Sequence, residues 1–135
     1  MADKPHLGLI VFSGTFEKVH YALVLASTAL ALNRPVTLFF TQGACGFLSP
    51  DWRSLPSEHG ATAGAVDDSY KQKGIGDFRT LLDAARELGA EIMVCEMGLK
   101  AIDLSADALD PAIQVKQGGA LTFLKATEDA QLLFI

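Results

Sequence analysis

The sequence predicts an α/β fold in which helices cover both faces of a parallel sheet. Three runs, at residues 7–12, 35–41 and 91–94, are almost continuously apolar, as expected of strands that are buried on both faces. Stretches with helical patterning separate these runs. Strands and helices that alternate in this way imply a parallel sheet joined by right-handed crossovers, within a single domain over residues 1–135.

The ends of two helices can be predicted from individual residues. The first helix is expected from about residue 17 to residue 33, because this stretch is rich in Ala and Leu and because Pro35 stops it. Asp77 can cap a later helix that runs to about residue 88. Gly89 then suits the position that follows a helix end.

Between these helices, the periodic pattern disappears from about residue 49 to residue 74. Proline, glycine and polar residues dominate there, and the pattern leaves room for one short helix. Long connections in compact domains are often functional lids. This segment follows the second strand, so we predict a mobile lid over the carboxyl edge of the sheet.

The sequence predicts shorter helices and strands in the carboxyl-terminal third of the chain. A short helix is expected after Cys95, and a turn or helical piece at residues 103–110. A brief fourth strand is expected at residues 113–115, a last helix at residues 118–126, and a final strand at residues 131–135.

Composition excludes several classes of protein. Half of the 135 residues are hydrophobic and the net charge is −5, without a basic stripe, so we expect no nucleic-acid partner. No apolar stretch reaches the ~20 residues of a membrane span, and no secretory signal pattern is present. Two cysteines form no disulfide framework, which favours reduced thiols in the cytoplasm. The high apolar fraction predicts a homo-oligomer.

Cys95 is the principal candidate for a catalytic residue. It follows the apolar run at residues 91–94 and precedes a helical pattern, which places a thiol at the carboxyl end of a strand. The free N–H groups of a helix start favour thiolate over thiol, whereas the neighbouring Glu96 acts against it. The alternative is that Cys95 is simply a small buried apolar residue.

Four auxiliary residues accompany Cys95. Cys45 lies in the turn after the second strand, at the same edge, so the two thiols could form a disulfide or relay sulfur. Ser13 and Thr15 flank a small-residue turn that either cradles an anion or only caps a helix. His20 could face the thiol edge or pack on the first helix. No histidine or cysteine spacing suits zinc, and we expect neither a metal ion nor a cofactor.

Several segments, taken in order, resemble the DsrE/DsrF/TusD-like family of small sulfur-trafficking proteins. These are residues 10–15, residues 36–43, residues 78–95 with their terminal cysteine, residues 115–119 and residues 129–134. The resemblance implies a five-stranded parallel sheet in a three-layer sandwich, with the second and third strands adjacent. It also implies a homo-oligomer, commonly a trimer or hexamer.

For Cys95, the resemblance implies a persulfide that is passed between sulfur donor and acceptor proteins. Cys45 and Glu96 depart from the family pattern, as does the polar connection at residues 49–74. Three functions follow as hypotheses: a persulfide carrier or sulfurtransferase that uses Cys95, a dithiol redox protein that uses Cys45 and Cys95, and a non-enzymatic oligomeric module that binds a small ligand.

Overall fold

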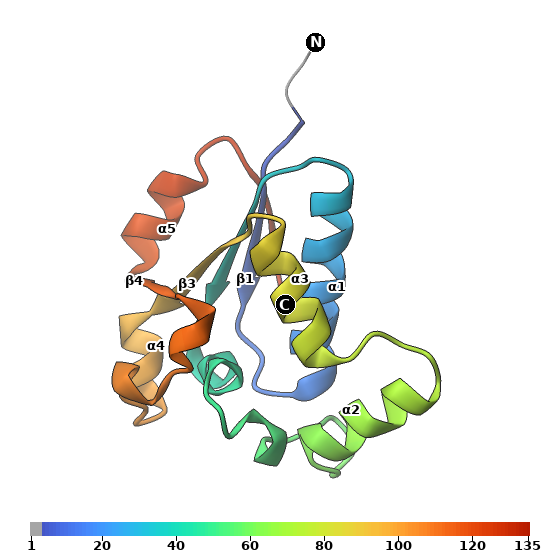
Figure 1. The fold of residues 1–135 in the computed structure, drawn as a ribbon. Helices are drawn as coiled ribbons and strands as arrows, with labels where there is room; N and C mark the ends of the chain where they lie inside the picture. The colour runs from blue at the N-terminus through green and yellow to red at the C-terminus, as the bar shows by residue number, and fades with distance from the viewer. Residues whose placement is uncertain (1–3) are drawn as a thin grey trace.

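The computed structural model describes residues 4–135, and all five of its strands belong to one parallel sheet (Figure 1). The strand order is β4-β3-β2-β1-β5. The strands are β1 (Leu7–Val11), β2 (Val36–Phe40), β3 (Glu91–Cys95), β4 (Lys116–Gly118) and β5 (Gln131–Phe134). The predicted α/β class is confirmed, as is the pairing of β2 with β3.

Helices cover both faces of this sheet. The α-helices are α1 (Phe16–Ala31), α2 (Ala63–Gln72), α3 (Phe78–Glu87), α4 (Glu96–Ala101) and α5 (Ala120–Ala126). The chain moves across the sheet in one direction from β1 to β4 and then returns past β1 to β5. Because parallel crossovers are right-handed, the return places α5 on the face opposite α1 and α3. Within residues 4–135, none of the helices combines the length and the apolar character needed to cross a bilayer.

Alternate residues of the strands build two separate cores. Leu38, Phe40 and Val94 point toward α1 and α3 and belong to the larger core. Phe39, Met93 and Cys95 point toward α5, where Phe123 completes a smaller core. The rings of Phe39 and Phe123 stack with centroids 4.7 Å apart. The thiol of Cys95 therefore lies under α5 and not under the longer helices.

The segment at residues 49–74, predicted as a lid, makes packing contacts with α1 and α3. It contains a 3-10 turn, η2 (Trp52–Ser54), and the ten-residue helix α2. The N–H of Phe16 at the start of α1 donates to the carbonyl of Pro56 at 3.0 Å. The ring of Trp52 lies 4.5 Å from that of Phe78, measured between centroids. The segment follows the carboxyl end of β2, as predicted, but it packs toward α1 and α3, away from the core that holds Cys95.

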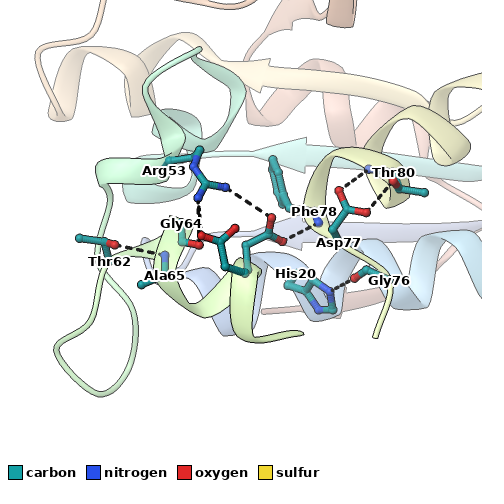
Figure 2. A network of polar contacts seen from close by, with 11 residues as sticks. His20, Arg53, Thr62, Gly64, Ala65, Gly76, Asp77, Phe78 and Thr80 are labelled. Carbon is teal, nitrogen blue, oxygen red and sulfur yellow. Dashed lines mark hydrogen bonds and ion pairs between the residues drawn. The ribbon is translucent and has the colours of Figure 1, made fainter. Parts of the chain in front are cut away.

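A buried carboxylate fixes α2 to the start of α3. Asp67 accepts a 2.8 Å hydrogen bond from the N–H of Phe78, which is one of the N–H groups that have no partner within α3. Arg53 lies 3.7 Å from the Asp67 carboxylate, bonds Asp68 at 2.9 Å and also donates to the carbonyl of Gly64 (Figure 2). One arginine thus joins η2 to α2, while Asp67 joins α2 to α3.

The predicted position of the fourth strand is wrong by three residues. Pro111–Ile113 forms a 3-10 turn, η4, and Gln114 adopts a left-handed conformation with φ of 58°. A strand cannot pass through such a residue, so pairing with β3 begins only at Lys116. The predicted last helix also begins later, at Ala120, because Gly118 still belongs to β4.

We predict that Asp67→Ala lowers the free energy of unfolding by about 2 kcal/mol or more, because it leaves the buried N–H of Phe78 without a partner. The matched control is Asp68→Ala, whose exposed carboxylate pairs with the same arginine and should cost less than about 1 kcal/mol. Urea unfolding followed by circular dichroism measures both. Equal losses in the two variants would contradict the role of Asp67.

Candidate functional site

Cys95 is at once the last residue of β3 and the residue that caps α4. Its backbone is extended, and its Sγ accepts a 3.4 Å hydrogen bond from the N–H of Gly98 in the first turn of α4. The predicted place of this thiol, at the carboxyl end of the third strand, is therefore confirmed. The sulfur thus lies beside a backbone donor at the start of a helix.

A close backbone contact sets the position of α4. A Cβ atom at Gly98 would lie 2.5 Å from the N atom of Gln42 and 2.6 Å from the Oγ1 of Thr41. Any side chain larger than glycine would therefore push α4 away from the segment that follows β2. Gly98 allows the two segments to touch, and the same residue supplies the N–H that reaches Cys95. Sequence reasoning did not single out Gly98, because one glycine three residues after a cysteine carries no recognised signal.

The sulfur of Cys95 is nearly covered. The residue is 4% exposed and packs with Phe39, Met93 and Phe123. Its neighbours along α4 are in contact with solvent: Glu96 is exposed and Met97 is 66% exposed. The thiol itself is thus buried, while the two residues that follow it in the chain are exposed.

Cys45 lies in a 3-10 helix, η1 (Gln42–Leu48), where the sequence predicted only a turn. It is fully buried, and its S–H donates to the carbonyl of Phe40 at 3.6 Å. Burial, reinforced by the nearby Cys95, raises the pKa of the Cys45 thiol to about 12. Both cysteines are free thiols, and their side chains belong to different cores. Cys45 is therefore a weak nucleophile at neutral pH.

The hydroxyls of Ser13 and Thr15 interact with each other. Their oxygens lie 3.0 Å apart, and Thr15 occupies the capping position of α1 without a side-chain capping bond. The N–H groups of Phe12 and Ser13 both donate to the carbonyl of Ile135. These donors are already used, which favours a structural turn over an anion cradle.

His20 packs among aromatic side chains. It is 4% exposed, and its Nε2 donates to the carbonyl of Gly76 at 2.8 Å (Figure 2). Its ring meets Tyr70 edge-on, with centroids 4.9 Å apart. These contacts are in the larger core, so His20 is not brought together with Cys95. Among the residues that the structure describes, no group of three or more His, Cys, Asp or Glu side chains could hold a metal ion.

Comparison with known proteins supports the fold. No protein-family model matches the sequence, and no curated protein matches it significantly. Among solved structures, the chain is similar to MTH1491, a protein of unknown function from Methanobacterium thermoautotrophicum. The match has a TM-score of 0.53 and 15% sequence identity, and it covers 98% of this chain and all of the other. At this identity, the likeness extends to the fold alone.

We predict that Cys45 resists alkylation by iodoacetamide in the folded protein up to about pH 9, because the buried thiol keeps its proton. The raised pKa also means that the folded state binds this proton more tightly than the unfolded state. The free energy of unfolding should therefore fall as pH rises from 9.0, the ordinary value, toward about 12.

Mass spectrometry of peptides after alkylation measures the first effect, and unfolding curves at several pH values measure the second. Cys45→Ala is the matched control, since it should reduce the slope of stability against pH in that window. Rapid alkylation of Cys45 in the folded wild-type protein would show that the thiol is accessible.

Proposed function

We propose that the protein carries sulfane sulfur as a persulfide on Cys95, as a persulfide carrier or sulfurtransferase of the cytoplasm. The single observation that supports this most is the hydrogen bond from the N–H of Gly98 to the Cys95 sulfur at the carboxyl end of β3. The sequence resemblance to the sulfur-trafficking family supports the same role. Sulfur donor and acceptor proteins are the partners that this role requires.

The transfer proceeds by displacement at sulfur. The Cys95 thiolate attacks the outer sulfur of a donor persulfide, the S–S bond of the donor breaks, and the donor leaves as a thiolate. The Cys95 persulfide then gives up its outer sulfur to an acceptor thiolate in the same way, which regenerates the Cys95 thiolate. No net oxidation or reduction occurs, so the cycle needs no cofactor.

The burial of Cys95 is compatible with two roles. A persulfide beneath α5 would be shielded from water and from small oxidants, which suits a carrier. The same 4% exposure also suits a small side chain that only fills the core between Met93 and Phe123. Reactivity of the thiol distinguishes these roles.

The dithiol hypothesis has less support. The second thiol of a redox pair attacks as a thiolate, and the pKa of about 12 that burial gives Cys45 slows this step at neutral pH. Cys45 is also fully buried, and its S–H is bonded to the carbonyl of Phe40. We therefore assign Cys45 a packing role beside the site.

Assembly into a homo-oligomer, a trimer or hexamer, is part of the proposal. Three leucines are exposed on α5, the helix over Cys95, and on the nearby strand β5. Leu121 and Leu124 of α5 are 69% and 52% exposed, and Leu132 of β5 is 42% exposed. Contact with another subunit would remove this apolar surface from water. Light scattering at micromolar concentration should give the mass of an oligomer, and a monomer would contradict the assembly.

We predict that Cys95 gains one sulfur atom when the protein is incubated with glutathione persulfide. Cys95→Ser should abolish the gain because the nucleophile is lost. Cys45→Ser should weaken it at most, since Cys45 only packs beside the site. Peptide mass spectrometry locates the added sulfur, and the rate of alkylation of each thiol against pH reports which thiol ionises.

Cys45→Ser also controls for the loss of a buried thiol as such. If Cys95 gains no sulfur and alkylates no faster than a free thiol at neutral pH, it is a packing residue. An intramolecular disulfide between Cys45 and Cys95 would instead support the dithiol protein. In either case, persulfide transfer would be excluded as the function of Cys95.

A further inference from the structure

The sheet has a point where the order of its strands reverses. From β1 the chain proceeds to β2, β3 and β4 on one side, whereas β5 pairs with β1 on the other side. In open α/β sheets, ligands bind outside the carboxyl ends of the strands at such a reversal. The expected crevice here lies at the ends of β1 and β5. Cys95 ends β3, which is separated from β1 by β2, so this crevice is distinct from the thiol.

A groove lies at this place. One cavity of about 630 Å³ is lined by Phe134 and Ile135 at the end of β5, by Tyr70 of α2, and by three residues of α1: Glu17, Lys18 and Tyr21. A second cavity of about 420 Å³ shares Glu17 and Tyr70 with the first and continues along α2 to Lys73. Each volume is within the ~300–1,000 Å³ that is usual for small-molecule sites.

Half of the residues that line the first cavity are aromatic. Tyr21 and Phe134 expose 56% and 67% of their surface, although both are large side chains. Tyr70 is held in place from behind, since its ring packs against Phe16 and His20 at centroid distances of 5.6 Å and 4.9 Å. One fixed ring and two exposed rings around an open space suit a flat aromatic molecule, which would stack on them and remove their faces from water.

Some charged side chains along the groove have a hydrogen-bond or ion-pair partner, and one has none. The carboxylate of Glu17 accepts the N–H of Glu58 at 2.9 Å, and Lys18 lies 3.5 Å from the carboxylate of Glu58. Lys73 caps the end of α2 through its backbone N–H, whereas its side-chain ammonium forms no hydrogen bond or ion pair with any other residue among 4–135. It follows Tyr70 by three residues and so lies one helical turn further along the groove. The groove therefore offers an aromatic region with one unpaired cation beyond it.

We propose that this groove binds a small planar aromatic compound that carries one anionic group. The aromatic part stacks between Tyr21, Tyr70 and Phe134, and the anionic group reaches Lys73 through the shared space beside Tyr70. This binding site is independent of persulfide transfer at Cys95. Neither proposal depends on the success of the other.

The test uses three probes: 2-naphthoate, its neutral analogue 2-naphthalenemethanol, and aliphatic hexanoate. Each is titrated into the ¹⁵N-labelled protein while amide NMR shifts are recorded. We expect 2-naphthoate to shift amides of α1, α2 and β5, to bind more tightly than the neutral analogue, and to leave β3 unchanged. Hexanoate should bind at least about tenfold more weakly, because it cannot stack.

Two variants separate the two parts of the ligand. Lys73→Gln should lower the affinity for 2-naphthoate by up to about fivefold, the usual limit for an exposed ion pair. The affinity for the neutral analogue should not change. Lys71→Gln, on the same helix but outside both cavities, is the matched control and should change neither. Tyr21→Ala removes an exposed ring and should lower the affinity for both aromatic probes about tenfold.

Several results would overturn the proposal. No shift with any probe at millimolar concentration would exclude the site, and shifts centred away from α1, α2 and β5 would place binding elsewhere. If Lys73→Gln and Lys71→Gln lose the same affinity for 2-naphthoate, Lys73 makes no specific contact with the anionic group. Sedimentation velocity adds a further readout: if Tyr21→Ala dissociates an oligomer, the groove is a subunit contact and not a ligand site.

Discussion

The arrangement around Cys95 depends on the contact between α4 and the segment after β2. Gly98 touches the backbone at Thr41 and Gln42, at distances that leave no room for a Cβ atom. Because α4 begins directly after β3, this contact determines where the first turn of α4 lies relative to Cys95. In this position the N–H of Gly98 lies 3.4 Å from the Cys95 sulfur. The chemistry proposed for the thiol therefore rests on a packing contact made by a residue without a side chain.

Right-handed crossovers place different helices on the two faces of the sheet. The steps from β1 to β4 place α1 and α3 on one face, and the return to β5 places α5 on the other. Alternation along β3 then directs Cys95 toward α5, while Cys45 enters the core on the opposite face. The same return creates the strand reversal at β1 and β5, where the aromatic groove lies. Thiol and groove thus share the carboxyl edge of one sheet, on different strands.

The sequence predicts well whatever depends on neighbours along the chain. Continuous apolar runs predicted β1, β2 and β3, while Asp77 and Gly89 predicted the two ends of α3. Contacts between distant segments were not predictable. Helix α2 is polar on average and contains a glycine, and it is held by Asp67 and Arg53, so its sequence resembles a loop. Gly98 likewise has meaning only once α4 meets the segment after β2.

The most direct measurement of the central claim is the rate of persulfide formation on Cys95 in Gly98→Ala, at a temperature where the variant is folded. Gly76→Ala is the control, because a Cβ atom there meets only the side chain of Leu81 at ordinary contact distance. We expect Gly98→Ala to load sulfur at least about tenfold more slowly than the wild type, since a small displacement of a reacting group has effects of this size. Gly76→Ala should load at the wild-type rate. Equal rates in Gly98→Ala and the wild type would contradict the claim that this contact positions the thiol.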